Sequence, residues 1–144
     1  MTKVSVIIAA YNMEKYIQAC VESLLKQTLT EIELLIVDDG SKDGTLAIIK
    51  EYEAKYPDKV RVLPKENGGL SSARNIALRN ICGKYVMFVD SDDMLLENTA
   101  QTLLKIAFEN DADIVEGSHQ VFNSSGSGAC YIHDDKTAKN GVYA

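Results

Sequence analysis

Three carboxylates stand within four residues of the sequence, in the run Asp90-Ser91-Asp92-Asp93. The apolar segment 85–89 precedes them directly, so they fall where a buried strand is expected to end. Like charges this close raise one another's pKa unless a cation or a ring of hydrogen-bond donors neutralises them. A divalent cation that also holds a substrate phosphate would do so, because hard cations prefer oxygen ligands. A solvated acidic turn is the alternative interpretation.

Polar clusters also follow three other apolar segments, and this pattern favours the cation. The clusters are 10–12 after segment 4–9, Asp38-Asp39-Gly40-Ser41 after segment 32–37, and 65–69 after segment 60–63. In an open α/β sheet, ligands bind outside the carboxyl ends of the strands. The four clusters are therefore expected to meet on one edge of a sheet. Strand ends are generally polar, but this general polarity does not readily explain why two separate strand ends, at 38–39 and 90–93, both carry neighbouring acidic residues.

Strand-like and helix-like segments alternate over the first hundred residues. Apolar runs predict strands at 4–9, 32–37, 60–63, 84–89 and from 113 as far as 122, and helical spacing predicts helices at 14–27, 43–56, 71–81 and 95–110. This order is typical of an α/β fold with a doubly wound, mostly parallel sheet and helices on both faces. The linker-like run 123–128 predicts a domain at 1–122, followed by a loop and a short remnant at 123–144.

Composition narrows the class of protein. The 144 residues suit one domain, and the apolar content of 46% is that of a globular protein. A net charge of -6 without a basic stripe argues against nucleic acid as a partner. No apolar run reaches the length of a transmembrane segment, and the strand-like start 4–10 does not resemble a signal peptide. Three cysteines without CxxC spacing predict free thiols and a cytoplasmic location.

Several sequence patterns with known chemistry are missing. No G-x-G-x-x-G follows the first predicted strand, and no G-x-x-x-x-G-K-[ST] occurs, which argues against a dinucleotide-binding domain and a P-loop. No Ser/His/Asp or Cys/His arrangement can be assembled around His119 and His133. Cys130 and His133 are close in sequence, but two ligands alone do not make a zinc site.

The motifs together resemble those of family 2 glycosyltransferases of the GT-A fold. The matching segments are 4–12, 36–45, 67–75 and 88–93, in that order, within residues 3–117. The resemblance implies the nucleotide-sugar-binding portion of such an enzyme, truncated after about the fifth strand. It also implies inverting, metal-assisted transfer of a sugar from a nucleotide-diphosphate sugar, expected to be a UDP-sugar, to an acceptor hydroxyl. Polysaccharide or glycan biosynthesis is the implied context, with a saccharide or lipid-linked acceptor.

The resemblance gives the first two motifs a role at the nucleotide base. Tyr11 would lie against the base, and Ala9 and Ala10 would shape the base pocket through their backbone. Asp39 would accept a hydrogen bond from an N–H of uracil, while Asp38 would brace the loop.

The third motif is expected at the sugar and phosphates. Asn67, Gly68 and Gly69 would let the backbone approach the sugar-phosphate closely, since glycine lacks a side chain. Arg74, with Lys65 as a second candidate, would face the diphosphate. The alternative is that either residue is an ordinary surface cation.

The fourth motif is expected to bind ribose and metal. Asp90 would bind the ribose hydroxyls, with Ser91 in the same nucleotide-sugar-binding set. Asp92 would coordinate Mg²⁺ or Mn²⁺ that bridges the two phosphates and stabilises the leaving nucleoside diphosphate. Asp93 would either face the donor sugar or cap the next helix.

The catalytic base of the family matches no motif in this chain. Members of the family carry this carboxylate in a second half, whereas Asp111, Asp113 and Glu116 come too early and Asp134 and Asp135 lie in a weakly patterned tail. The catalytic residue is therefore unassigned. The alternative function is a donor-binding module that binds UDP-sugar and metal without efficient catalysis. Apolar surface near the fifth strand would then favour a homodimer, and the inner face of the membrane is a candidate location.

Two other classes of acidic α/β protein fit the sequence less well. A phospho-receiver domain has an acidic pair after its first strand and a phosphorylated Asp after its third, where this chain has Tyr11-Asn12 and Leu63-Pro64. A nucleotidyltransferase usually carries a glycine-rich loop with Lys or Arg after its first strand, and that loop is missing.

Overall fold

The computed structural model describes residues 2–120, 130–131 and 142–143. The chain forms two compact units, Met1–Asn98 and Thr99–Ala144. The division between Asn98 and Thr99 follows the fourth predicted strand, 84–89, and cuts the fourth predicted helix, 95–110, near its start. The predicted domain boundary at 122/123 lies outside the described residues.

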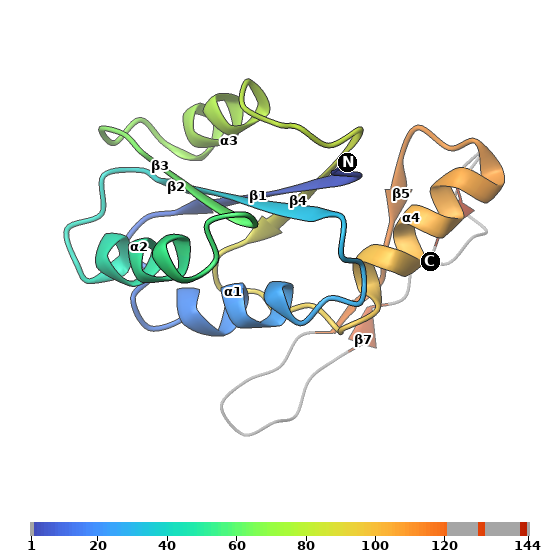
Figure 1. Ribbon diagram of the computed structural model, residues 1–144, viewed down its shortest axis with the longest axis horizontal. Coiled ribbons are helices and arrows are strands. Elements are labelled where there is room, and N and C mark those ends of the chain that lie inside the picture. Colours follow the sequence, from blue (N-terminus) through green and yellow to red (C-terminus); the bar gives the residue numbers. More distant parts are fainter. Residues whose placement is uncertain (1, 121–129, 132–141, 144) are drawn as a thin grey trace. The chain divides into compact units, whose positions relative to one another are not determined.

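The first unit is built on a parallel four-stranded sheet with strand order β3-β2-β1-β4 (Figure 1). The strands are β1 (Val4–Ala10), β2 (Ile32–Asp38), β3 (Val60–Pro64) and β4 (Tyr85–Asp90), and the helices between them are α1 (Ile17–Leu25), α2 (Thr45–Lys55) and α3 (Leu70–Leu78). The strand order reverses at β1, which has β2 on one side and β4 on the other. Ligands of such sheets bind at this switch in strand order, so the carboxyl ends of β1 and β4 mark the expected site.

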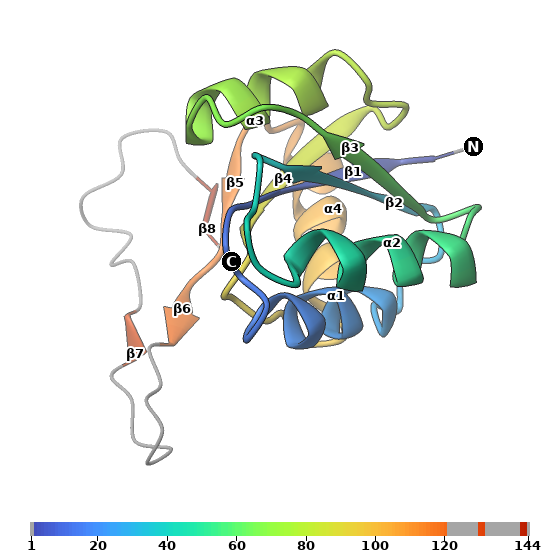
Figure 2. The same cartoon turned by 90° about the vertical axis from the view of Figure 1, so that its left-hand side faces the viewer.

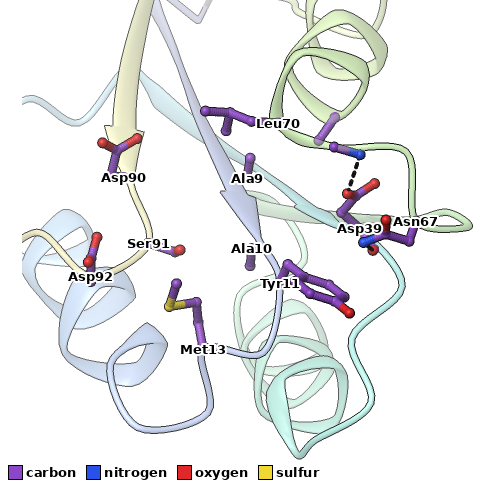
Figure 3. Close-up of a pocket in the computed structure, with 12 residues that line it drawn as sticks. Ala9, Ala10, Tyr11, Met13, Asp39, Asn67, Leu70, Asp90, Ser91 and Asp92 are labelled. Carbon is purple, nitrogen blue, oxygen red and sulfur yellow. Dashed lines mark hydrogen bonds between the residues drawn. The ribbon is translucent and has the colours of Figure 1, made fainter.

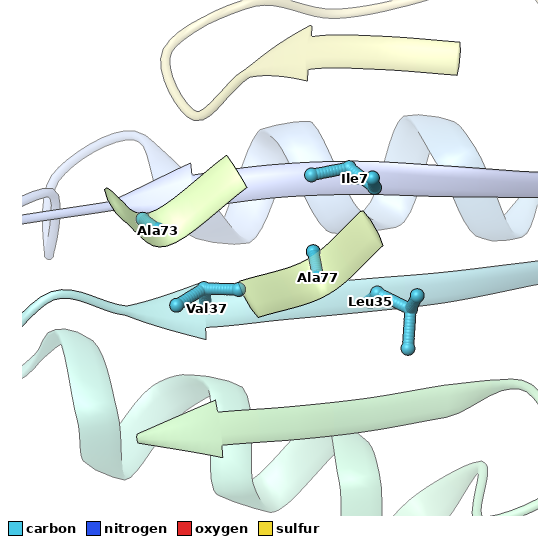
Figure 4. Packing of buried hydrophobic residues seen from close by; sticks show 5 residues of the cluster. All are labelled: Ile7, Leu35, Val37, Ala73 and Ala77. Carbon is cyan, nitrogen blue, oxygen red and sulfur yellow. The ribbon is translucent and has the colours of Figure 1, made fainter. Parts of the chain in front are cut away.

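Helices cover both faces of the sheet, as the alternating sequence predicted. Figures 1 and 2 show α1 and α2 on one face and α3 on the other. Ile7, Leu35 and Val37 point toward α3, which places Ala73 and Ala77 against them (Figure 4). Two alanines at this contact leave space for the large strand side chains beneath the helix. On the opposite face of the sheet, the buried side chains of α1 are Ile17, Cys20, Val21 and Leu24.

At the amino end of the sheet, a buried carboxylate links three strands and the loop after α3. Glu33, in β2, accepts hydrogen bonds through Oε1 from Ser5 Oγ at 2.5 Å and from Cys82 N at 2.6 Å. Arg61 Nη1 of β3 lies 3.5 Å from Glu33 Oε2. A Cβ on Gly83 would lie 2.7 Å from Ser5 N, so only glycine fits this connection between α3 and β4. We call Ser5, Glu33, Arg61 and Cys82 the Glu33 clamp.

The second unit differs most from the expected elements. It contains α4 (Thr99–Asn110), and short pairs form between β5 (Val115–Glu116) and β8 (Val142–Tyr143) and between β6 (His119–Gln120) and β7 (Cys130–Tyr131). The prediction of a fourth helix from residue 95 was wrong at its start, since Leu95–Asn98 lie outside α4. The fifth predicted strand is divided into two short ones. In the described part of the chain, no helix is long and apolar enough to span a membrane.

Candidate functional site

A cavity of about 350 Å³ opens at the carboxyl ends of β1, β2 and β4, at the switch in strand order (Figure 3). All four polar clusters of the sequence reach it or the loops beside it. The cavity is lined by Ala9, Ala10, Tyr11, Met13, Asp39, Asn67, Gly69, Leu70, Ala73, Asp90, Ser91 and Asp92. The volume suits a small-molecule ligand.

Eight of the ten predicted site residues line this cavity. The other two, Gly68 and Arg74, are not in the wall but contact residues that are: Gly68 N donates to Asp39, and Arg74 Nη2 donates to Asp90. Sequence reasoning missed Met13, Leu70 and Ala73. Because α3 begins at Leu70, one residue before the predicted start at 71, its first turn reaches the cavity.

The loop that carries Tyr11 is fixed to the loop after β2. Asn12 N donates to Ser41 Oγ at 3.0 Å, and Lys42 N donates to Asn12 Oδ1 at 2.8 Å. Asn12 has a φ of 55°, a left-handed conformation that asparagine tolerates better than most residues. Tyr11 keeps 41% of its surface exposed, and its ring lies beside the cavity (Figure 3).

Asp39 is a buried carboxylate at the amino end of α3. Its Oδ1 accepts from Gly68 N at 3.0 Å and its Oδ2 from Gly69 N at 2.7 Å, while Lys65 Nζ forms a salt bridge with Oδ1. Burial acts to raise the pKa of Asp39, but the hydrogen bonds from Lys65, Gly68 and Gly69 outweigh burial and lower it. A carboxylate has about four acceptor positions, so these three donors leave one for a ligand.

A close approach of two loops holds this arrangement in place. Gly40 has a φ of 77°, and a Cβ there would lie 2.8 Å from Asn67 N. Asn67 Nδ2 donates to Asp39 O at 3.0 Å. The loop after β2 and the loop before α3 therefore form one wall of the cavity, and a larger residue at position 40 would push them apart.

Asp38 acts on a loop and does not line the cavity. Its Oδ2 accepts from Ser41 N at 3.2 Å, which is the bracing role expected for it. Its other oxygen, Oδ1, is buried and has no hydrogen-bond partner within the described residues.

The acidic turn after β4 forms the opposite wall. Asp90 keeps 60% of its side chain exposed, and its Oδ1 accepts from Arg74 Nη2 at 2.9 Å. The Arg74 guanidinium lies 5.3 Å from the centre of the Phe88 ring, a distance at which a cation and a ring attract. Asp92 is exposed at the cavity, whereas Ser91 is buried. Arg74 is thus held by an acid and a ring at the edge of the site.

The turn makes its surroundings electronegative. Cys20 lies beneath it on α1, and burial, followed by the charges of Asp93, Asp92 and Asp90, raises the pKa of the thiol to about 12. The thiol is therefore neutral and can donate its proton, and Cys20 Sγ lies 3.6 Å from Asp90 O. A bound cation would relieve the same repulsion.

The donor set at this wall suits a cation that is shared with a ligand. Within the described residues, no three His, Cys, Asp or Glu side chains come together as a metal site. Mg²⁺ is usually bound by one or two carboxylates together with substrate phosphates, so the exposed carboxylate of Asp92 at the cavity fits such an ion. His133 of the weakly patterned end lies outside the described residues.

Comparisons with known proteins point to one family. The family model described as "Glycosyl transferase family 2" matches residues 5–129. Glycosyltransferase GlyA of Streptococcus pneumoniae is 41% identical over 131 residues, which are 91% of this chain and 18% of GlyA. The poly(ribitol-phosphate) beta-N-acetylglucosaminyltransferase TarS of Staphylococcus aureus is 41% identical over 80% of this chain and 20% of its own length.

Solved structures agree with these sequence matches. TarS 1-349 in complex with UDP-GlcNAc superposes with a TM-score of 0.79 at 37% identity, covering 88% of this chain and 37% of that one. A mannosyltransferase from Pyrobaculum calidifontis, in complex with GDP-Man and Mn2+, gives a TM-score of 0.66 at 28% identity over 81% of this chain and 34% of that one. The chain spans less than half the length of each of these proteins.

Proposed function

The chain belongs to glycosyl transferase family 2, and on this premise we propose that its cavity binds a UDP-sugar as the donor in sugar transfer. The observation that carries the proposal is the cavity at the switch in strand order, with Asp39 in one wall and the acidic turn in the other. The structure of TarS with UDP-GlcNAc supports a uridine nucleotide sugar as ligand.

The nucleotide base would lie at the Asp39 wall. Tyr11 offers an aromatic face for stacking, and the small Ala9 and Ala10 leave room for a planar ring. The one acceptor position left on Asp39 would take the uracil N–H. Asn67 and Gly68 would bring the backbone close to the sugar-phosphate.

The diphosphate would lie at the acidic wall. Asp92 would hold Mg²⁺ or Mn²⁺, and Asp90 with Ser91 would contact the ribose. When bound, the divalent ion would supply electrostatic stabilisation of the nucleoside diphosphate that leaves the sugar. The mannosyltransferase structure with GDP-Man and Mn2+ supports a divalent metal. Arg74, which Asp90 and Phe88 orient, would add a second positive charge toward the phosphates.

Transfer itself needs an acceptor and a base. We propose inversion at the sugar, with an acceptor hydroxyl on a saccharide or lipid-linked glycan, and a polysaccharide or glycan as product. No described residue is assigned as the base that removes the acceptor's proton. The alternative is a donor-binding module that binds UDP-sugar and metal but transfers sugar inefficiently. Turnover of a UDP-sugar, measured as released UDP, separates the two.

Cellular context and self-association are part of the same proposal. Cys20 and Cys82 are free thiols, which supports a cytoplasmic location, and the inner face of the membrane is the place where a lipid-linked acceptor would be met. The exposed apolar side chains Phe108 and Ile114 of the second unit support a homodimer. Sedimentation of the full chain at two concentrations would test the dimer.

Titration calorimetry with UDP, with and without Mn²⁺, tests the donor site. We expect UDP to bind and Mn²⁺ to tighten the binding, and we expect Asp92→Ala to remove the effect of Mn²⁺ while leaving metal-free binding. Absence of any UDP binding, or a Mn²⁺ effect that survives in Asp92→Ala, would contradict the proposal.

A further inference from the structure

One side of α1 and the turn after it holds the backbone of the segment that carries the acidic turn. Cys20 and Ser23 lie on α1, Gln27 comes two residues after the helix ends, and all three contact this segment. The contacts are Cys20 Sγ to Asp90 O at 3.6 Å, Leu95 N to Ser23 Oγ at 3.1 Å and Gln27 Nε2 to Leu96 O at 2.7 Å. We call Cys20, Ser23 and Gln27 the α1 seam.

The seam matters because the segment has no secondary structure of its own. Residues 91–98, between β4 and α4, form neither helix nor strand. Asp90 is fixed by the pairing of β4 with β1, and Asp93 N donates to Asp90 O at 3.0 Å. The next fixed points are Leu95 and Leu96 on the seam. The backbone on both sides of Asp92 is therefore tethered, and the tethers restrict the backbone that carries its carboxylate.

Gln27 is the most informative member of the seam. The residue is 7% exposed, and its side-chain amide donates to Ser23 O at 3.2 Å as well as to Leu96 O. A buried amide is unfavourable unless it is hydrogen-bonded, and an apolar residue would fill the same space. Gln27 does not line the cavity. Its link to the site is therefore its hydrogen bond to Leu96, in the segment after Asp92.

We propose that Gln27, with Ser23, is a positioning residue for the metal and diphosphate end of the donor site. It holds the backbone that presents Asp92, and so it sets how well the carboxylate meets a divalent ion bound to a diphosphate. This inference rests on the proposed function. Groups that orient metal ligands without touching the metal commonly change metal affinity by about 10- to 100-fold.

The test compares Gln27→Met with Gln18→Met in the full chain. Methionine keeps the length of glutamine and removes the amide. Gln18 is exposed on the same helix and donates to Glu22, so the matched change leaves the seam intact. UDP is titrated calorimetrically with and without MnCl₂, and the thermal unfolding midpoint of each variant is recorded.

We expect Gln27→Met to weaken UDP binding about tenfold in the presence of Mn²⁺ and to leave metal-free binding unchanged. Gln18→Met should match the wild type in both titrations. In an Asp92→Ala background, Gln27→Met should have no further effect, because both changes act on one carboxylate. If Gln27→Met does not fold, Ser23→Ala, which removes the acceptor for Leu95 N, decides in its place.

The outcomes separate this inference from the proposed function. If Mn²⁺ does not affect UDP binding by the wild type, the proposed metal site fails and the inference fails with it. If Mn²⁺ tightens wild-type binding but Gln27→Met behaves as Gln18→Met, the inference alone is overturned. If Gln27→Met lowers UDP affinity equally with and without Mn²⁺, the inference is also overturned, because a purely structural role would weaken UDP binding in both conditions.

Discussion

Glu33 and Asp39 lie at opposite ends of β2, and their surroundings are built from the same parts. Each is a buried carboxylate that accepts from the backbone, from one N–H at Glu33 and from two at Asp39, and pairs with a basic side chain, Arg61 in one case and Lys65 in the other. Each also ties a neighbouring loop of the α3 region to the sheet. Burial and hydrogen bonding therefore do not distinguish the structural end from the proposed donor site.

The difference lies in the space beside each carboxylate. At the Glu33 clamp, a Cβ on Gly83 would already collide with Ser5, so the chain itself fills the space. At Asp39 a cavity of about 350 Å³ opens, and the exposed carboxylates of Asp90 and Asp92 stand in its other wall. A buried acid thus becomes a candidate binding group where the fold leaves room and a second charged group faces the same space.

The largest effect is expected at the Glu33 clamp. Glu33→Ala removes the acceptor of Ser5 Oγ and Cys82 N and the acidic partner of Arg61, and we expect the free energy of unfolding to fall by about 3 kcal/mol. Urea unfolding of the wild type and of Glu33→Ala measures this difference in the free energy of unfolding. The folded variant should bind UDP as the wild type does, because the clamp is remote from the cavity. If Glu33→Ala lost UDP affinity but not stability, the distinction between a structural Glu33 and a ligand-binding Asp39 would be wrong.

The next largest effect is expected in the opposite wall of the cavity. Asp92→Asn keeps the shape of the side chain and removes its charge, and we expect UDP affinity in Mn²⁺ to fall about 30-fold, or about 2 kcal/mol. The unfolding free energy should change little, since the side chain is exposed. Paired with Glu33→Ala, this variant separates binding from stability, and a destabilised Asp92→Asn would contradict that separation.

The sequence predicted the sheet better than the contacts around the site. Segments 4–9 and 32–37 were recognisable as strands because β1 and β2 are covered on both faces and so are apolar throughout. The start of the fourth helix was wrong because Leu95 and Leu96 bond to Ser23 and Gln27, about 70 residues away in sequence. Likewise, periodicity could place Asp39 at a strand end but could not show that Lys65 and two glycines already bind it.

The pH dependence of stability sharpens the role of Asp39. Its folded-state pKa is lowered, so the stability it contributes is present above its unfolded pKa, near 4, and is lost as pH falls through the folded pKa. Asp39→Asn lacks this contribution at every pH. We therefore expect the difference in thermal midpoint between wild type and variant to be largest near neutral pH and to shrink in acid.

The control for this measurement is Asp58→Asn, which removes the same charge at an exposed turn. Its thermal midpoint should follow that of the wild type from pH 7 to pH 3. A gap between wild type and Asp39→Asn that stays constant over this range would mean that the Lys65, Gly68 and Gly69 bonds do not stabilise the ionised carboxylate.

The smallest expected effect compares the two ends of β4. Arg74 lies over Phe88 beside the cavity, and Lys84 lies over Tyr85 at the other end of the strand, each 5.3 Å from the ring centre. Phe88→Leu should weaken UDP binding about threefold, because a partly exposed cation and ring attract by about 0.5–1 kcal/mol. Tyr85→Leu removes an equivalent pair and should leave the affinity unchanged. Equal losses in both variants would show that β4 affects the site through its packing, whereas a loss confined to Phe88→Leu would assign the effect to the orientation of Arg74.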